Sequence, residues 1–328
     1  AGLGMDPLRL TIAAQKPVRS AVVPIAGACP GMWPATKCSG PWLFPVRVGD
    51  AVRPAICWLC EELVASGIER IVLVTDEATE ANMRHLFQQR EDVAVLRGVP
   101  AKAAEYDEEL LALGRRMVFV RQEKPTGLRD AVLLCEQALE GEPFLLAFGD
   151  HLCSSSAPEG TGCIEQLLAG FDATRCVAAM HCIGKDLVHT AGIFACREPP
   201  SPLPPPLGPE PQAREEAKAV TWPISQVKEK PTREYAEEHL KTPVLSEGRY
   251  LASFGQYVLT PSFMKALQAA ESHRHFTEVL DAHRQREGLD GVLIRGCRWD
   301  LGHPSTYVEA LSAQAQPEPE AKRPRTSA

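Results

Sequence analysis

Continuous apolar runs alternate along this chain with segments in which apolar residues recur at helical spacing. The run Arg70–Thr75 (RIVLVT) is typical of a strand covered on both faces of a sheet, and helical periodicity follows it over Glu77–Gln88. Strands that alternate with helices of about a dozen residues indicate βαβ units and parallel pairing. We therefore predict an α/β fold with a Rossmann-like mixed, mostly parallel sheet flanked by helices.

The same two patterns predict the other elements. Further strands are expected at 21–26, 93–96, 117–121, 144–148, 176–183, 219–228, 250–259 and 292–294. Further helices are expected at 54–66, 101–113, 128–139, 261–270 and 276–287. Ligands of open α/β sheets bind in the crevice outside the carboxyl ends of the strands. We expect the binding site there, with a smaller region of the domain beginning after about Cys176.

The chain is expected to hold one folded domain over residues 19–311, with an N-terminal extension at 1–18 and a disordered tail at 312–328. The tail is polar and rich in proline, which leaves too little apolar surface for folding. Residues 198–211 (EPPSPLPPPLGPEP) form a proline-rich insertion, because each proline fixes φ and lacks the N–H that a helix or ladder needs. The insertion is interpreted as a surface excursion of polyproline II type or, alternatively, as a ligand for an SH3-type domain.

The composition is that of an ordinary globular protein, with 45% hydrophobic and 23% charged residues and a net charge of -7. The negative balance argues against nucleic-acid binding, and no apolar run is long enough to span a membrane. The 11 cysteines are scattered, which favours a reducing compartment, so we expect the protein in the cytoplasm. Cys57 and Cys60 form a C-x-x-C inside a predicted helix, either as part of a buried helix face or as a redox or metal pair.

The most informative segment is the predicted strand that begins at Ala21 and the loop that follows it as far as Lys37. A loop after the first strand of an α/β pattern is where nucleotide phosphates are usually bound. This loop resembles the motif G-x-G-T-R-x-x-P-A-T-K of bacterial UTP–glucose-1-phosphate uridylyltransferases, which belong to the sugar-nucleotide pyrophosphorylase superfamily. The matching positions are Gly27, Pro34, Ala35, Thr36, Lys37 and the later Pro45. The second glycine, the threonine, the arginine and a later lysine of that motif are replaced by Cys29, Pro30, Gly31 and Pro41.

A second segment resembles the nucleotide-binding part of the same family, R-Q-x-x-x-x-G-L-G-H-A. It begins with Arg121 and Gln122 and continues with Gly127-Leu128-Arg129-Asp130-Ala131. The resemblance implies that Gln122 reads the edge of the uracil and that Ala26, Gly27 and Gly127 contact the nucleotide. An amide at the carboxyl end of a strand also lies in the ligand crevice of an open sheet, and it offers both a donor and an acceptor. The alternative is a loop glutamine with no role.

Two aspartates follow predicted strands at distant points of the chain. Asp150 resembles the aspartate of the family's L-P-D, and Asp300, in Trp299-Asp300-Leu301-Gly302, resembles that of Y-D-x-G. The resemblance implies that both bind one Mg²⁺ ion. Magnesium typically takes one or two carboxylates together with phosphate and water, so this residue set suits it. Taken without the resemblance, each aspartate is better explained as a cap at the end of a strand.

Two further segments resemble the sugar-binding motifs of the family. Val227-Lys228-Glu229-Lys230-Pro231 matches V-x-E-K-P, and Ala191-Gly192-Ile193 resembles Y-G-V with its tyrosine replaced. The resemblance implies that Glu229 and Gly192 bind the sugar and that Lys230 contacts a phosphate. A carboxylate accepts hydrogen bonds from neighbouring hydroxyls, and an ammonium pairs with a phosphate. The alternative for residues 227–231 is a solvated charged turn.

The resemblance spans about residues 19–310 and implies a sugar-1-phosphate nucleotidyltransferase that makes UDP-glucose and pyrophosphate from UTP and glucose 1-phosphate. The implied partners are UTP or a UDP-sugar and a hexose 1-phosphate, and the implied cofactor is Mg²⁺. The implied catalytic residues are Lys230 and Lys37. Assembly into a homo-oligomer is left open. Gly31 and Pro41 lack the charges of the family's arginine and lysine, for which Arg47, Arg53 and Arg129 are candidate replacements. The alternative function is therefore a catalytically impaired homologue that binds a sugar nucleotide or regulates an active homologue.

Overall fold

The structure is a computed structural model that describes residues 18–48, 51–89, 101–157, 160–197 and 220–314. The N-terminal extension, the strand expected at 93–96, the proline-rich insertion and almost all of the expected tail lie outside the described residues.

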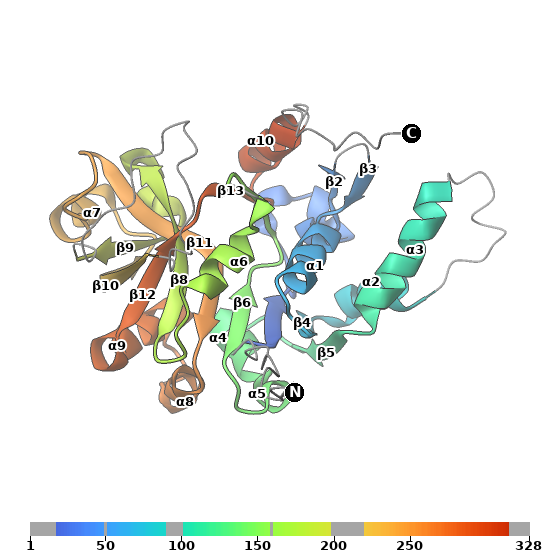
Figure 1. The fold of residues 1–328 in the computed structure, drawn as a ribbon, viewed down its shortest axis with the longest axis horizontal. Helices are drawn as coiled ribbons and strands as arrows, with labels where there is room; N and C mark the ends of the chain where they lie inside the picture. The colour runs from blue at the N-terminus through green and yellow to red at the C-terminus, as the bar shows by residue number, and fades with distance from the viewer. Residues whose placement is uncertain (1–17, 49–50, 90–100, 158–159, 198–219, 315–328) are drawn as a thin grey trace, which may run out of the picture.

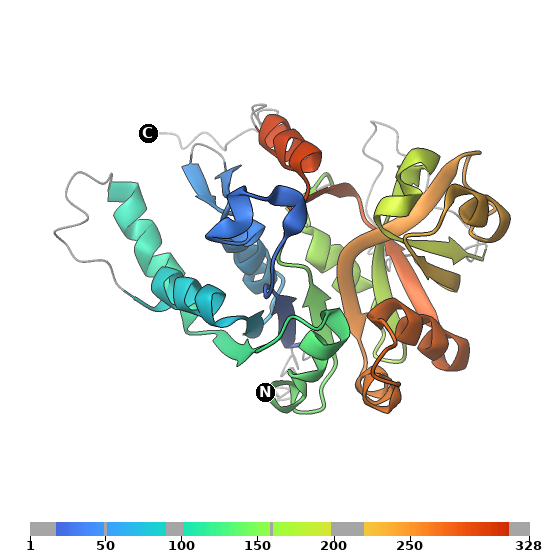
Figure 2. The same ribbon diagram turned by 180° about the vertical axis from the view of Figure 1, so that it is seen from behind.

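A nine-stranded sheet forms the centre of the protein, in the order β5-β4-β1-β6-β11-β8-β12-β10-β9, and β9 also pairs with β11. Figure 1 shows this sheet crossing the molecule with helices on both of its faces, and Figure 2 shows the same arrangement from behind. Its strands are β1 (Ser20–Pro24), β4 (Arg70–Thr75), β5 (Met117–Arg121), β6 (Phe144–Ala147), β8 (Cys176–Gly184), β9 (Gly192–Cys196), β10 (Thr221–Glu229), β11 (Arg249–Leu259) and β12 (Leu289–Leu293).

Five of the expected helices are present close to their expected bounds, whereas the helices at 163–169, 233–239 and 304–314 were not predicted. The helices are α1 (Ala55–Ala65), α2 (Glu77–Gln88), α3 (Ala101–Gly114), α4 (Leu128–Leu133), α5 (Glu136–Leu139), α6 (Cys163–Ala169), α7 (Arg233–His239), α8 (Pro261–Ala269), α9 (Phe276–Glu287) and α10 (Pro304–Gln314). The prediction of a single helix at 128–139 is wrong, because two short helices, α4 and α5, occupy this segment. The Cys135 N–H donates to the Val132 carbonyl at 3.0 Å, an i→i+3 bond that tightens the chain and ends α4.

The sheet has two halves that differ in strand direction. β5, β4, β1 and β6 pair in parallel, whereas β11 is antiparallel to β6, β8 and β9. β10 is antiparallel to both β12 and β9, and β12 pairs in parallel with β8. The predicted mixed α/β sheet is confirmed, with its parallel pairing concentrated in the N-terminal half. Apolar runs reveal that a strand is buried, but they do not reveal its direction.

Alternate side chains of the parallel half pack into two separate cores. Ile71 of β4 and Leu145 of β6 lie in the core under α1, α2, α3 and α6. Their neighbours Val72 and Leu146 point the opposite way, into the core under α4, α5, α8 and α9. Successive residues of a strand face opposite sides of a sheet. Both faces are therefore buried, which explains why these strands are continuous apolar runs.

Two small sheets lie beside the large one and were not predicted. β2 (Pro45–Val48) pairs with β3 (Ala51–Pro54), and β7 (His151–Ser155) pairs antiparallel with β13 (Gly296–Asp300). Short 3₁₀ turns at Pro30–Met32, Ala35–Lys37 and Pro41–Leu43 shape the loop that follows β1, and a further one spans Lys185–Thr190. After β13 the chain enters α10, which ends at Gln314, inside the segment expected to be disordered.

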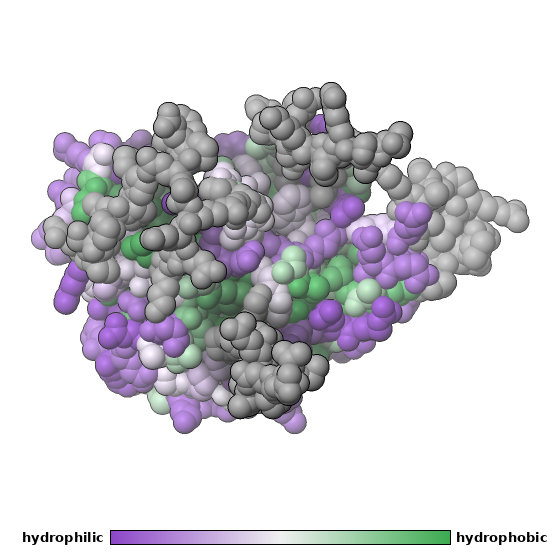
Figure 3. Space-filling view, in the orientation of Figure 1, coloured by the Kyte–Doolittle hydropathy of each residue, from purple (hydrophilic) through white to green (hydrophobic). Residues whose placement is uncertain are grey.

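In the view of Figure 3, hydrophilic residues are spread over most of the visible described surface, and apolar residues gather near the centre and in smaller areas at the left. The large apolar side chains that are most exposed are scattered on different elements: Trp33, Val52 and Val308. Scattered exposed apolar residues are normal on a folded domain. Within the described ranges, no helix is both long enough and apolar enough to cross a bilayer.

The two-core arrangement predicts that a central leucine contributes far more to stability than a peripheral one. Leu145 is fully buried in β6, whereas Leu134 at the end of α4 is 47% exposed. We expect Leu145→Ala to lower the free energy of unfolding by about 2–5 kcal/mol and the matched Leu134→Ala to change it by less than about 0.5 kcal/mol. Urea denaturation followed by circular dichroism measures both values. Equal losses in the two variants would contradict the assignment of Leu145 to the core.

Candidate functional site

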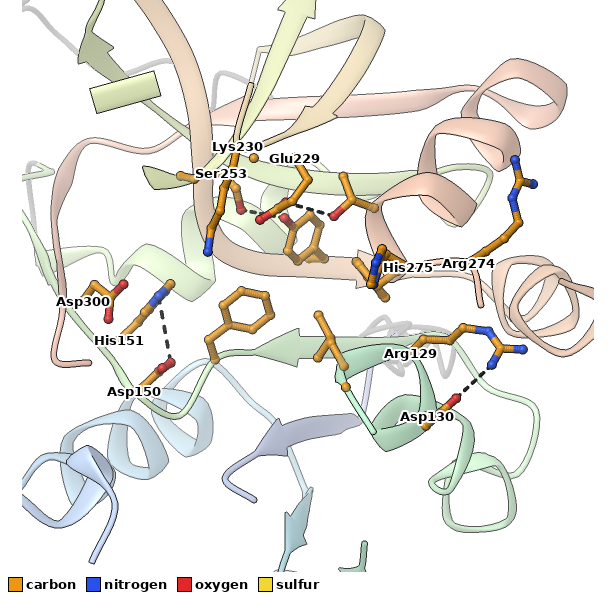
Figure 4. A pocket seen from close by; sticks show the side chains of 18 of the residues that line it. Arg129, Asp130, Asp150, His151, Glu229, Lys230, Ser253, Arg274, His275 and Asp300 are labelled. Atoms are coloured by element: carbon orange, nitrogen blue, oxygen red, sulfur yellow. Dashed lines mark hydrogen bonds and ion pairs between the residues drawn. The ribbon is translucent and has the colours of Figure 1, made fainter. Parts of the chain in front are cut away.

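A cavity with a volume of about 570 Å³ opens between the parallel half of the sheet and the C-terminal strands. Its walls come from loops at the carboxyl ends of β5 and β6, from the ends of β9 and β10, and from the loop that leads into α9. A cavity of this size at the strand ends suits a small-molecule ligand. Of the predicted site residues, the cavity is lined by Gly127, Asp150, Gly192, Glu229, Lys230 and Asp300. Figure 4 shows the charged members of this set facing one another across the opening.

Asp150 and Asp300 are brought together by the small sheet of β7 and β13. Asp300 lies opposite His151 in this pairing, and the Leu301 N–H donates to the Asp150 carbonyl at 2.8 Å. The Gly302 N–H holds one carboxylate oxygen of Asp300 at 2.9 Å. A Cβ placed on Gly302 would lie 3.0 Å from Asp300 Oδ1 and 3.7 Å from Asp150 Oδ2. The two carboxylates therefore converge on the same small space.

The burial of Asp150 and its closeness to Asp300 change the pKa values of the groups around them. Burial, and then the negative charge of Asp300, raise the pKa of Asp150 to about 6, although 34% of its side chain remains exposed to solvent. Burial and both carboxylates likewise raise the pKa of the Cys29 thiol to about 11. Cys29 is thus protonated at neutral pH, which does not suit a reactive thiolate. The pair has the charge and the oxygen donors that a hard divalent cation prefers.

This residue set is small for a metal site made of protein ligands alone. Among the described residues, no group of three or more histidine, cysteine, aspartate or glutamate side chains is arranged to hold a metal ion. Magnesium commonly completes its shell with water and substrate phosphates rather than with protein groups. Two convergent carboxylates beside an open cavity fit that mode of binding.

Glu229 and Gly192 lie side by side because β10 pairs with β9. The two residues are direct partners in the antiparallel register. A Cβ on Gly192 would lie 3.1 Å from Glu229 Oε2, so a larger residue would crowd the carboxylate. Thr277, in the first turn of α9, donates its hydroxyl hydrogen to the same oxygen at 3.0 Å. Glu229 is therefore held at the wall of the cavity with its other oxygen available to a ligand.

Lys230 follows β10 directly and has a strained backbone. Its φ is +41°, a left-handed conformation that costs a non-glycine residue about 1–2 kcal/mol. Its N–H donates to the Ala191 carbonyl at 3.1 Å, which fixes the turn against β9. Figure 4 shows the Lys230 side chain extending toward Asp300 and His151. Such strain persists where the surrounding structure enforces it, and it occurs preferentially at functional sites.

The predicted nucleotide-binding residues form a second, adjoining group. Gly27 has a φ of +93° and packs against Pro125, and its N–H donates to Asp76 Oδ2 at 3.1 Å. The Gln122 amide is buried and donates to the Gly127 carbonyl at 3.3 Å. Gly127 begins α4 with a φ of +110° and lines the cavity. Gln122, Ala26 and Gly27 lie behind this lining rather than in it.

The loop after β1 places its charged residue away from the cavity. Lys37 is exposed on the 3₁₀ turn Ala35–Lys37 and does not line the cavity. Gly31 lies against the turn after Asp300, where a Cβ would come within 2.7 Å of the Gly302 carbonyl oxygen. Pro41 is buried. The replacements of the family's arginine and lysine are thus built into the packing of this loop.

Two of the arginines considered as replacements are already bound to other groups. Arg53 contacts both oxygens of the Glu61 carboxylate at 3.1 Å. Arg129 donates to the Leu267 and Ala270 carbonyls at the end of α8, at 3.1 and 2.9 Å, and pairs with Asp130. The structure therefore gives both of them positioning roles in the fold.

Several cavity residues were not predicted from the sequence. They are His151, Ser253, Tyr257, Thr277 and Arg298. Ser253 and Tyr257 share a hydrogen bond of 2.6 Å. His151 lies beside Asp150, with its Nε2 3.9 Å from Asp150 Oδ1. Burial holds the pKa of His151 well below its usual range, so the ring is neutral and forms no ion pair.

Comparison with known proteins agrees with this geometry. No model of a known protein family matches the sequence. The chain is 25% identical over 315 residues to the UTP–glucose-1-phosphate uridylyltransferase of Staphylococcus epidermidis RP62A, covering 93% of this chain and 95% of that protein. It is 26% identical over 315 residues to the enzyme of the same name from Streptococcus pneumoniae TIGR4, covering 93% of each.

Solved structures show the same fold. A UTP-bound UDP-glucose pyrophosphorylase from Acinetobacter baumannii superposes with a TM-score of 0.70 at 20% identity, covering 92% of this chain and 95% of that one. A UDP-glucose pyrophosphorylase complexed with UDP-glucose gives a TM-score of 0.67 at 20% identity, covering 90% and 98%.

The chain therefore shares the fold of solved UDP-glucose pyrophosphorylases. The predicted resemblance to UTP–glucose-1-phosphate uridylyltransferases is confirmed by relatives of 25–26% identity over nearly the whole chain. The relatives reported above are named as enzymes, so the comparisons lend no support to the alternative of an impaired homologue.

The raised pKa of Asp150 predicts a pH-dependent stability without divalent cations. Below about pH 4 its carboxyl is protonated in both the folded and the unfolded chain. Between about pH 4 and a folded pKa of about 6, the folded state retains a proton that the unfolded chain has released, so stability falls as pH rises. We expect Asp150→Asn to be more stable than the wild type above pH 7 and equally stable near pH 4. Urea denaturation at both pH values tests this, and a difference independent of pH would contradict it.

The close approach of Gly31 to the turn after Asp300 predicts that no side chain is tolerated there without movement. The opposing atom is a backbone oxygen, which cannot rotate away. We expect Gly31→Ala to cost about 1–3 kcal/mol of stability. Gly184→Ala is a matched control, because a Cβ at Gly184 meets nothing within 4 Å. For the same reason, the double variant Gly31→Arg with Pro41→Lys should not gain phosphate binding by this loop. Equal stability of Gly31→Ala and Gly184→Ala would contradict the tight packing of Gly31.

Proposed function

We propose that this protein is a Mg²⁺-dependent sugar-1-phosphate nucleotidyltransferase that makes UDP-glucose and pyrophosphate from UTP and glucose 1-phosphate. The observation that supports this best is one cavity lined by four separate segments of the chain. Asp150, Asp300, Gly192 and the pair Glu229 and Lys230 all meet there. Each segment resembles a different motif of the uridylyltransferases, whose fold the chain shares.

The sugar is proposed to bind against Glu229 and Gly192. The Glu229 carboxylate accepts hydrogen bonds from neighbouring sugar hydroxyls, and the Thr277 hydroxyl fixes its orientation. Gly192 leaves the space that a ring needs next to that carboxylate, since a Cβ there would crowd Oε2. This wall of the cavity therefore orients the hexose so that its 1-phosphate faces Lys230.

The reaction is an in-line displacement at phosphorus. A phosphate oxygen of glucose 1-phosphate forms a bond to the α-phosphorus of UTP, while the bond from that phosphorus to the bridging oxygen breaks and pyrophosphate leaves. Negative charge must be held on the phosphoryl oxygens, so catalysis consists of positioning and electrostatic stabilisation. Lys230 supplies a positive charge directed into the cavity by its strained backbone. Bound at Asp150 and Asp300, Mg²⁺ would neutralise phosphate charge and orient the oxygens.

The direct test is release of pyrophosphate from UTP and glucose 1-phosphate in the presence of Mg²⁺. We expect turnover by the wild type and a fall in kcat of about 10²–10³-fold in Lys230→Met. Lys228→Met is the matched control, because Lys228 lies two residues earlier on β10, does not line the cavity and contacts the Tyr235 ring. Equal activity in the two variants would remove Lys230 from the proposed role.

Ligand-induced thermal shifts test the assignment of the metal ligands, and together with the activity assay they test the alternative function. Mg²⁺ with UDP-glucose should raise the Tm of the wild type by mass action, and Asp300→Asn should lose most of that shift. If the wild type binds UDP-glucose but releases no pyrophosphate over a panel of sugars and nucleotides, the impaired-homologue alternative is correct. If Asp150→Asn and Asp300→Asn both keep the full shift, the two aspartates are not metal ligands.

A further inference from the structure

Arg298 is a cation of the cavity that neither the motifs nor the proposed mechanism uses. It lies on β13, two residues before Asp300, and residues two apart on a strand point to the same face. In the pairing of β13 with β7, Arg298 lies opposite Cys153 and Asp300 lies opposite His151. Arg298 also lines the cavity together with Asp150, His151 and Lys230. The register of one short sheet thus fixes this guanidinium next to the two carboxylates.

The guanidinium has no anionic partner of its own. Within the described part of the chain, no carboxylate forms an ion pair with Arg298, and its Nε is buried without a hydrogen-bond partner. Its positive charge acts on Asp150, and it further lowers the pKa of both His151 and His181. Most partly buried arginines are paired, as Arg53 and Arg129 are in this protein. A guanidinium that lines a ligand cavity and pairs with no carboxylate among the described residues can take a bound anion as its partner.

We propose that Arg298 is a phosphate-binding residue of the cavity, which contacts phosphoryl oxygens of the nucleotide together with Lys230. This inference rests on the proposed function, and it adds a residue to the site that the motifs do not contain. A guanidinium presents a planar set of donors that matches the oxygens of a phosphate, so it holds an anion with defined geometry.

The proposal also explains how phosphate could bind although the loop after β1 has lost the cationic residues of the family motif. The loop after β1 offers no cation to the cavity, because Gly31 is packed against the Gly302 carbonyl and Lys37 is exposed outside the cavity. Phosphate charge must then be met by cations from other segments that line the cavity. Lys230 directly follows β10, and Arg298 lies within β13. These two cations supply the charge that the loop does not.

Binding measurements test this role without requiring turnover. Isothermal titration calorimetry with UTP and with uridine, each with Mg²⁺, should show that Arg298→Gln weakens UTP binding by about 10- to 100-fold and leaves uridine binding unchanged. Arg298→Lys retains the charge and should lose less. Arg295→Gln, an exposed arginine outside the cavity, is the matched control and should bind both ligands like the wild type.

The outcomes separate this inference from the proposed function. If Arg298→Gln is folded and binds UTP within twofold of the wild type, the inference is wrong whatever the activity of the protein. If UTP and uridine binding weaken equally, Arg298 maintains the shape of the cavity, and the inference is again wrong. If Arg298→Gln does not fold, Arg298→Lys is measured instead. A UTP affinity equal to that of the wild type would then contradict the claim that the planar guanidinium of Arg298 binds the phosphate. If wild-type protein binds Mg²⁺-pyrophosphate but not UTP, the proposed nucleotide function fails, and the same comparison with pyrophosphate as the probe decides the role of Arg298.

Discussion

The site depends on the pairing of two short strands that are far apart in the sequence. β7 follows the central strand β6, and β13 follows the last strand of the large sheet, so their contact joins the N-terminal and C-terminal parts of the chain. This pairing places Asp150 and Asp300 together, and burial first, then the negative charge of Asp300, raise the pKa of Asp150. Backbone hydrogen bonds of the sheet and of the turn at Gly302 hold the two carboxylates in place against their mutual repulsion. A cation between them, as in the proposed metal site, would relieve that repulsion.

The two halves of the large sheet supply different chemistry to the same cavity. The parallel half ends in loops that contain glycines with positive φ at Gly27 and Gly127, a conformation that other residues rarely adopt. The antiparallel half ends in side chains that carry charge, Glu229 and Lys230, and its neighbour α9 contributes Thr277. Parallel strands all place their carboxyl ends at one edge of the sheet, whereas antiparallel hairpins return the chain to that edge. The cavity lies where these two arrangements meet.

Much of this arrangement follows from sequence patterns that reflect burial. Both faces of β4 are covered, so Arg70–Thr75 appears as an unbroken apolar run, and the one-sided burial of α2 appears as helical periodicity. The bounds of these two elements were predicted to the residue. The parallel pairing was predicted from the alternation of strands and helices, but the position of the antiparallel strands was not, because it depends on how chain segments pair rather than on which side chains are apolar. β7 and β13 were missed since each has only five residues and mixes polar with apolar side chains.

The site was predictable where a motif fixes local chemistry and unpredictable where the fold brings separate segments together. Glu229, Lys230 and the two aspartates were predicted because each motif names its own residue, and all four line the cavity. Arg298 and Thr277 belong to no quoted motif, and their places in the cavity depend on the register of β13 and on the first turn of α9. Lys37 was inferred from the motif alone, and the structure places it outside the cavity, on one of the three 3₁₀ turns that shape its loop.

The loop after β1 lacks the charged residues of the family motif, and its small residues instead pack against the turn at Gly302. Gly31 approaches the Gly302 backbone so closely that no side chain fits between them, and Cys29 lies near enough to both aspartates for their charges to act on its thiol. The loop thus covers the paired carboxylates with small, uncharged residues. A cation at that position would be attracted by the carboxylates and would compete with a metal ion for them. An uncharged loop leaves the charge of Asp150 and Asp300 available to the proposed metal ion, and it is consistent with the proposal that Lys230 and Arg298 bind the phosphates.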